Sequence, residues 1–112
     1  MAKIIEKSEN LDARQLFNMT TGDDLTKISE CNGRQFDIEA YVIYTDINGR
    51  SGEEQEILTF ATSDGDIICT NSATVIRKFR TMLECFTLPI TDVIVKSGIS
   101  KGGRTYYDLG LK

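Results

Sequence analysis

The chain has 112 residues, with 13 basic and 17 acidic side chains, no His, no Trp and three Cys. An apolar content of 40% and a charged content of 27% are ordinary for folded proteins and exclude wholesale disorder. The missing His excludes Ser-His-Asp and Cys-His catalysis, and the net charge of −4 argues against a generic nucleic-acid coat. We expect one domain over 1–112, with residues 1–10 as a flexible lead-in.

The cysteines and the hydropathy indicate a compartment. Cys31, Cys69 and Cys85 are odd in number and widely spaced, which predicts free thiols in a reducing cytoplasm rather than a disulfide framework or zinc site. The N-terminal residues become charged before an apolar run can form, and no apolar run approaches the roughly 20 residues of a membrane helix. The sequence therefore predicts a soluble cytoplasmic protein without membrane contact.

The first elements along the chain are a helix and three strands. Apolar residues at helical spacing predict a short helix over 12–19, and a loop is expected over 23–32. Residues 34–46 have apolar side chains at alternate positions, which predicts a long strand with one apolar face. Two further strands are predicted over 54–62 and 67–69, each preceded by a turn signal. The apolar face of the long strand is expected to carry Phe36, Ile38, Ala40, Val42 and Tyr44.

A longer helix is predicted after the third strand. Asn71 or Ser72 can cap its first turn, and Pro89 prevents it from continuing. Strands over 92–97 and 104–111 follow, joined by a glycine-rich loop. The apolar stripe of this helix recurs at three- and four-residue steps, at Val75, Ile76, Phe79, Met82, Leu83 and Phe86.

The order of these elements predicts a fold. Three strands, a helix and two strands are the order of an OB-fold, a five-stranded Greek-key barrel whose helix lies between strands three and four. The expected fold class is therefore mainly β, an OB-like barrel with a short additional N-terminal helix. A β-sheet covered by a single helix would give the same order, so this alternative stays open.

The charge is unevenly distributed. Residues 1–72 hold 6 basic and 14 acidic side chains, a balance of −8, whereas residues 73–112 hold 7 basic and 3 acidic ones, a balance of +4. Such asymmetry suggests nucleic-acid contact. In the last strand pair, the segment 97–106 combines Lys101 and Arg104 with three glycines. In an OB-fold this segment is one of the loops that bind oligonucleotides, although an ordinary solvated hairpin would have the same composition.

Aromatic side chains near these cations are candidates for stacking on bases. Tyr106 lies on the same predicted face as Arg104, and Tyr41 is expected on the exposed face of the long strand unless a bulge reverses its phase. Tyr44 and Phe60 are further candidates, with core packing as the alternative. The remaining phenylalanines are expected in the core: Phe17, Phe36, Phe79 and Phe86.

The sequence offers no catalytic apparatus. The paired carboxylates lie among turn residues, where solvation explains them, and the Asp64-Gly65-Asp66 segment lacks the spacing of a calcium loop. The segment 100–104 does not match a phosphate-binding P-loop. We therefore expect a protein that is not an enzyme and that has no cofactor or metal.

Three segments resemble a known family. The strand-to-helix segment 66–79, which runs through Thr-Asn-Ser, is similar to that of small bacteriophage single-stranded-DNA-binding proteins. The final hairpin over 89–104 and the N-terminal segment 16–22 also resemble this family, so that the similarity covers about residues 12–111. The resemblance implies a protein that coats DNA strands exposed during phage replication in the host cytoplasm, with phage replication proteins as partners and no cofactor.

The sequence thus leads to one main hypothesis and one alternative. The main hypothesis is a non-sequence-specific single-stranded-DNA-binding protein of open oligomeric state, and the alternative is an acidic module or DNA mimic that binds a host or phage protein. In the main hypothesis the residues that contact DNA are Tyr41, Tyr44, Phe60, Arg77, Lys78, Arg80, Lys96, Lys101, Arg104 and Tyr106.

Overall fold

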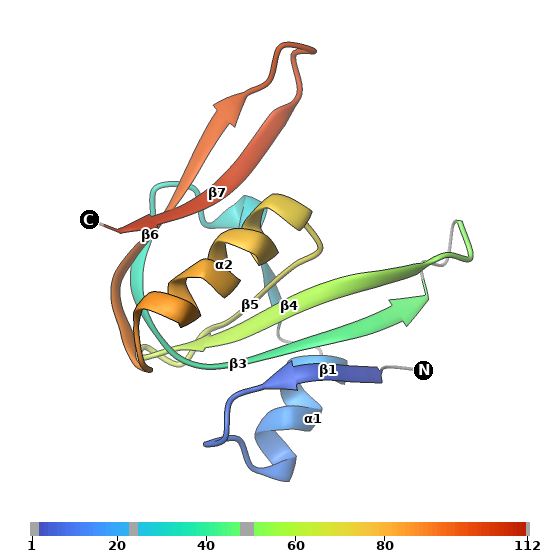
Figure 1. Cartoon of the computed structure of the whole chain (residues 1–112), viewed down its shortest axis with the longest axis vertical. Coiled ribbons are helices and arrows are strands. Elements are labelled where there is room, and N and C mark those ends of the chain that lie inside the picture. Colours follow the sequence, from blue (N-terminus) through green and yellow to red (C-terminus); the bar gives the residue numbers. More distant parts are fainter. Residues whose placement is uncertain (1–2, 23–24, 48–50, 112) are drawn as a thin grey trace.

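A computed structural model describes residues 3–22, 25–47 and 51–111 and shows a mainly β protein with two α-helices (Figure 1). In chain order its elements are β1 (Lys3–Lys7), α1 (Ala13–Thr21), β2 (Leu25–Lys27), the 3-10 turn η1 (Ile28–Glu30), β3 (Gln35–Ile47), β4 (Glu54–Thr62), β5 (Ile67–Thr70), α2 (Ala73–Cys85), β6 (Ile90–Ile99) and β7 (Thr105–Leu111).

All seven strands belong to one curled sheet. Its order is β2-β5-β4-β3-β6-β7, and β1 pairs with β3 outside this path. The long strand β3 pairs with β4 along one edge, while its other edge is divided between β6 near Phe36 and β1 near Tyr44. The β3–β4 and β6–β7 hairpins leave the curled body in different directions, and α2 lies beside the sheet between them (Figure 1).

The predicted order of three strands, a helix and two strands is confirmed for 35–111, and the short N-terminal helix is confirmed as α1. Two expectations were wrong. Residues 3–7 of the supposed lead-in form β1, whose neighbour Ser8 donates its N–H to the Tyr41 carbonyl at 3.0 Å. Within the supposed loop, β2 pairs in parallel with β5. The sheet therefore has seven strands instead of the five expected.

The predicted alternation of β3 is interrupted by a bulge. The register with β4 shifts between Ile38 and Ala40, which turns the following side chains to the opposite faces. Phe36 and Ile38 consequently share the main core with Tyr41, whereas Val42 and Tyr44 pack on the other side of the sheet. The expectation that all five alternating residues face one core was therefore wrong, and both faces of β3 are covered.

Helix α2 closes the main core. Ser72 caps it by accepting the N–H of Val75, and Phe86 provides the C-cap, so the helix ends before Pro89 is reached. The fully buried Phe79 stacks on Phe60, with ring centroids 6.1 Å apart. The predicted stripe is confirmed at its centre, where Val75, Ile76, Phe79 and Met82 are buried.

Helix α1 begins with reciprocal caps. Asp12 accepts the N–H of Gln15 at 2.8 Å, and the Gln15 side chain accepts the N–H of Asp12 at 3.2 Å. The helix buries Met19 against Tyr44 on the face of β3 opposite the main core. None of the described helices is long and apolar enough to cross a membrane.

Candidate nucleic-acid interface

The β6–β7 hairpin is anchored in the core at one end and projects from the body at the other (Figure 1). Val93, Val95 and Leu109 at its base are buried. At its tip, the Ser100 N–H donates to the Arg104 carbonyl at 2.9 Å, and the Gly103 N–H donates to the Ser100 carbonyl at 2.9 Å. Gly103 has φ 79°, a conformation that favours glycine, so the sequence defines a tight turn at this position.

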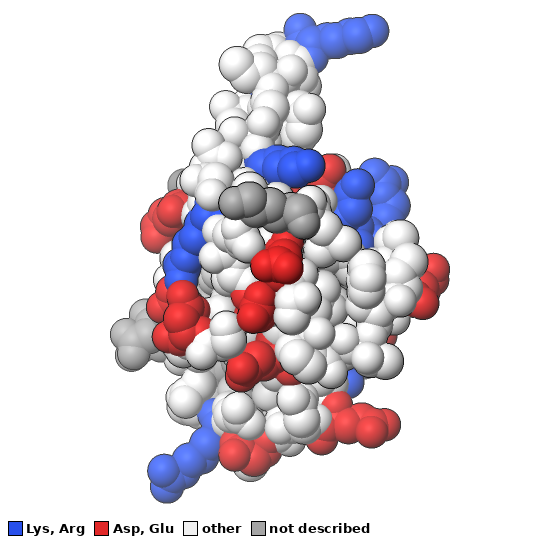
Figure 2. Space-filling model, turned by 90° about the vertical axis from the view of Figure 1, so that its left-hand side faces the viewer, with Lys and Arg blue, Asp and Glu red and all other residues white. Residues whose placement is uncertain are grey.

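Three predicted phosphate contacts lie along this hairpin. Lys96, Lys101 and Arg104 are all exposed, and none of them forms an ion pair within the described residues. Figure 2 shows Lys and Arg side chains at the end and around the base of the projecting hairpin, with most Asp and Glu side chains of this face on the body below. The hairpin therefore presents positive charge away from the acidic surface.

Tyr106 is the exposed aromatic residue of the hairpin, with 49% of its surface accessible. It lies directly opposite Gly98, and the Tyr106 ring covers the space that a side chain at position 98 would occupy. Tyr107 points to the opposite face of β7 and packs at the margin of the main core. The two adjacent tyrosines therefore separate, as the strand period predicts, into one exposed and one packed ring.

The three predicted cations of α2 differ from one another. The Arg80 guanidinium is engaged by Glu56 at 3.1 Å and by Glu6 at 3.7 Å, so it ties α2 to β4 and β1. Lys78 pairs with Asp108 of β7 at 3.6 Å. Arg77 is exposed and forms no ion pair among the residues that the structure describes. Phosphate contact by these three residues stays a prediction, and in the structure carboxylates already engage Arg80 and Lys78.

Three predicted stacking residues are buried. Tyr41 packs edge-on against Phe79 at 5.1 Å, and its hydroxyl donates to Glu6 at 3.1 Å. Burial and this carboxylate raise the pKa of Tyr41 to about 12. Tyr44 packs against Met19, and Phe60 is wholly enclosed. The bulge in β3 explains why Tyr41 is buried, because it turns this ring toward the main core.

Two phenylalanines depart from the prediction in the opposite direction. Phe36 and Phe79 are in the core as expected, but Phe17 is 65% exposed on α1 and Phe86 is 45% exposed at the end of α2. The α1 contact with the sheet buries Met19 instead of Phe17, and Phe86 is the C-cap residue at which α2 has already ended. The expectation of burial was wrong for both.

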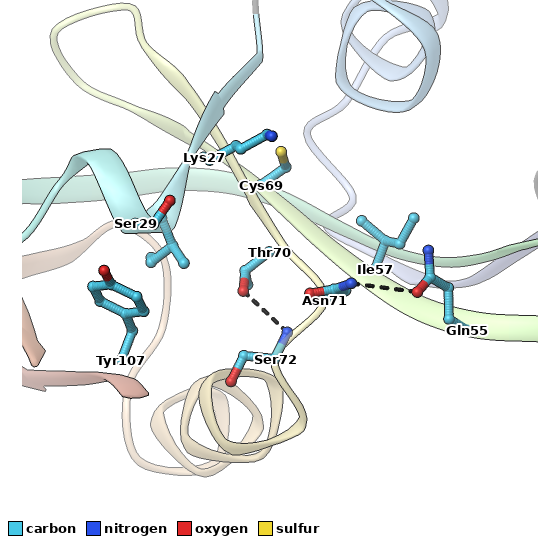
Figure 3. A pocket seen from close by; sticks show the side chains of 10 residues that line it. Lys27, Ser29, Gln55, Ile57, Cys69, Thr70, Asn71, Ser72 and Tyr107 are labelled. Carbon is cyan, nitrogen blue, oxygen red and sulfur yellow. Dashed lines mark hydrogen bonds between the residues drawn. The ribbon is translucent and has the colours of Figure 1, made fainter. Parts of the chain in front are cut away.

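A hollow of about 440 Å³ lies between the two hairpins, bounded by η1, β4, β5 and β7 (Figure 3). Tyr107 and Ile57 provide its apolar walls from β7 and β4. At its floor, the Ser72 N–H donates to Thr70 Oγ1 at 3.1 Å. No sequence pattern indicates this hollow, because one of its walls belongs to β2 and η1, in the segment predicted as a loop.

A second hollow of about 400 Å³ lies along α2 and shares Gln55 and Asn71 with the first. Arg77 and Arg80 line it, but so does Glu56, the carboxylate that engages Arg80. The Asn71 amide donates to the Gln55 side chain at 3.3 Å (Figure 3). This second hollow therefore has two cations and one carboxylate in its lining, and Arg77 is the cation there that no carboxylate of the described residues engages.

The carboxylate clusters are partly neutralised within the protein. Arg34 pairs with Asp64 at 2.9 Å and also with Asp66, and these hydrogen bonds raise the pKa of the guanidinium. The hydrogen bond from the Thr62 hydroxyl, followed by that from Arg34, lowers the pKa of Asp64. No group of three or more Cys, Asp and Glu side chains within 3–22, 25–47 and 51–111 is arranged to hold a metal ion.

Comparisons with protein-family models, with curated proteins and with solved structures find no match to this chain. The function of this protein is therefore inferred from the residues of the hairpin and of the hollow at its base.

Proposed function

We propose that this protein binds single-stranded DNA without sequence specificity and that the β6–β7 hairpin is its main contact element. The observation that carries the proposal is the combination of three cations, none of them ion-paired with a described residue, and one exposed aromatic ring on a hairpin that projects from an acidic body. Cations neutralise phosphates, and a tyrosine ring stacks on any base, so this surface needs no particular sequence. The expected role is binding, without catalysis or a cofactor.

The negative charge of the body also favours DNA binding at the hairpin. Phosphates are repelled by the carboxylates of the first 72 residues and attracted by Lys101 and Arg104 at the hairpin tip, so the potential is focused on one element. The net charge of −4 is consequently compatible with DNA binding. A field of this kind raises the rate of encounter and fixes where on the protein the strand lands.

We further propose that the curled sheet is an OB-like barrel to which β1 and β2 have been added. In this correspondence β3, β4, β5, β6 and β7 are the five barrel strands, and α2 lies between the third and fourth. In OB-folds the face of strands two and three binds oligonucleotides together with the loop between strands four and five. The corresponding parts here are the β4–β5 wall of the hollow beside Tyr107 and the β6–β7 turn.

The biological role that we propose is to coat strands exposed during phage DNA replication in the host cytoplasm, together with phage replication proteins. Its support is the resemblance of residues 12–111 to small bacteriophage single-stranded-DNA-binding proteins. The alternative, an acidic module that mimics DNA, was motivated by the carboxylates clustered around 46–66. It has less support, because Arg34 and Arg80 engage three of them, Asp64, Asp66 and Glu56.

The direct test is a titration of fluorescein-labelled oligo-dT with the full chain, followed by fluorescence anisotropy at low and at moderate salt. We expect binding that weakens as salt rises, and a much weaker response to a duplex of the same length. Because the chain has no Trp, quenching of its tyrosine emission is an independent signal. An absence of binding to oligo-dT at low salt in both assays would overturn the proposal.

A further inference from the structure

The β6–β7 ribbon contains two glycines at positions where strands usually carry side chains. Gly98 lies in β6 and Gly110 in β7, and both are inside the paired region, opposite Tyr106 and Ile94 respectively. Glycine weakens a strand because it has no side chain to pack and loses more conformational freedom on folding. Neither residue has the positive φ that would require glycine. The space above these two residues therefore needs a separate explanation.

The space above Gly98 is filled by Tyr106. A Cβ built at position 98 would lie 2.5 Å from Tyr106 Cζ and 2.9 Å from Cε1, and closer still to the hydroxyl oxygen. Real Cβ atoms do not approach other heavy atoms so closely, so any larger residue at position 98 would displace the ring. Tyr106 consequently lies over the backbone of the opposite strand and remains half exposed.

The space above Gly110 is filled in the same way by Lys96. A Cβ at position 110 would lie 2.7 Å from Lys96 Cε and 2.9 Å from Nζ. Lys96 is paired in the register with Asp108, so Lys96, Gly98, Tyr106, Asp108 and Gly110 all belong to one face of the ribbon. The Asp108 carboxylate on this face is engaged by Lys78 at 3.6 Å. On the opposite face, Ile99 is 76% exposed and no glycine opens a comparable space.

From these contacts we propose that Gly98 is a positioning residue for DNA binding: it holds the Tyr106 ring against the ribbon, ready to stack on a base. Gly110 has the equivalent relation to Lys96. The face that carries Tyr106 and Lys96 is therefore the DNA-binding face of the hairpin. A ring already held in one orientation loses less freedom when a base stacks on it, which increases affinity without adding a contact. This inference rests on the proposed function and assigns a role to a residue that touches no DNA.

The test is a double-mutant cycle with Gly98→Ala and Tyr106→Ala, measured as the Kd for labelled oligo-dT. Tyr106→Ala removes the stacking ring and is expected to weaken binding about 5- to 150-fold. Gly98→Ala displaces the ring and is expected to weaken binding at least about 3-fold in the wild-type background. When Tyr106 is already Ala, we expect Gly98→Ala to change the Kd less than about 2-fold, because the residue acts through the ring.

The matched control is Ile99→Ala, next to Gly98 in the chain but on the face of the ribbon opposite Tyr106 and Lys96. Ile99 is 76% exposed on the face that this inference leaves free of DNA, so the Kd should stay within about 2-fold of the wild type. Thermal unfolding of each variant separates a displaced ring from a damaged fold, since Gly98→Ala should leave the unfolding temperature within a few degrees.

The outcomes distinguish this inference from the proposed function. If the wild-type protein fails to bind oligo-dT, the proposed function is wrong. If the wild type binds and Gly98→Ala binds equally well, the positioning role of Gly98 is wrong while the proposed function stands. If Gly98→Ala weakens binding equally in the wild-type and Tyr106→Ala backgrounds, the residue does not act through Tyr106, and the inference is again overturned.

Discussion

The two long hairpins of this protein are built alike and are chemically opposite. Both are antiparallel, both contribute to the main core, and they leave the curled body in different directions (Figure 1). Over its described residues, the far end of the β3–β4 hairpin carries Asp46, Glu54 and Glu56. The far end of the β6–β7 hairpin carries Lys101 and Arg104, with exposed glycines between them.

The hairpins also differ in how their aromatic residues are used. Tyr41, Tyr44 and Phe60 of the β3–β4 hairpin are buried, because α2 covers one face of the sheet and α1 covers the other. Tyr106 of the β6–β7 hairpin has no such cover and remains half exposed. The same secondary structure thus provides a covered structural unit in one case and an exposed ribbon suited to binding in the other.

The largest expected effect is a difference in stability between substitutions in the two hairpins. Phe60→Ala should lower the free energy of unfolding by about 3–5 kcal/mol, because it empties the space between Phe36 and Phe79. Tyr106→Ala should lower it by less than about 1 kcal/mol, since the ring is half exposed. Urea unfolding followed by circular dichroism measures both values.

If Phe60→Ala does not fold, Phe60→Leu provides the same test with a smaller cavity. Equal losses of stability for a Phe60 variant and for Tyr106→Ala would contradict the assignment of the two hairpins to different roles.

The next effect is a change in the salt dependence of DNA binding when the cations of the β6–β7 hairpin are removed. Lys101→Ala/Arg104→Ala should reduce the slope of log Kd against log salt by about 1.4, which corresponds to two phosphate contacts on a single strand. The matched control is Lys7→Ala/Arg14→Ala, which removes the same charge from exposed positions on the body. A control that lowers the slope as much as the hairpin variant would show that only the total charge matters.

The smallest effect concerns Tyr41 of the β3–β4 hairpin. The pKa of Tyr41 is raised to about 12, and the unfolded chain ionises near the ordinary value of 10. The unfolded state therefore loses its proton first as pH rises, so this contribution to stability is complete below pH 10 and disappears between about pH 10 and 12. Denaturant unfolding at intervals of pH should show a smaller alkaline loss for Tyr41→Phe than for the wild type. Identical alkaline losses would show that Tyr41 is not the group responsible.

The sequence predicted the elements with strong patterns. Neighbouring residues alone determine three of these features, so they were recognisable without knowledge of the tertiary structure. They are the long strand β3, the apolar stripe of α2 and the cap at Ser72. The β6–β7 hairpin and the split between Tyr106 and Tyr107 follow from the same strand period. The exposed cations of the candidate site were found for this reason.

What the sequence did not predict depends on contacts between distant segments. The strand β1 is short, charged and exposed, and it is held by pairing with β3, so no local pattern reveals it. Residues 40–44 are apolar at every position, which conceals the bulge and the face to which Tyr41 belongs. The ion pairs of Arg80 likewise depend on Glu6 and Glu56, which are brought together only by the folded sheet.

The divided edge of β3 has a consequence for how the protein unfolds. Because β3 pairs with β4 on one side and with both β6 and β1 on the other, it joins the N-terminal strand to the ribbon that carries Tyr106. Neither β1 nor the β6–β7 ribbon can separate from the sheet without losing its pairing with β3. Backbone amides near Val42 should therefore exchange with solvent only through global opening, while those at the hairpin tip exchange through local fluctuations. This exchange pattern would mean that the sheet around β3 unfolds as one cooperative unit, while the tip of the β6–β7 hairpin opens separately.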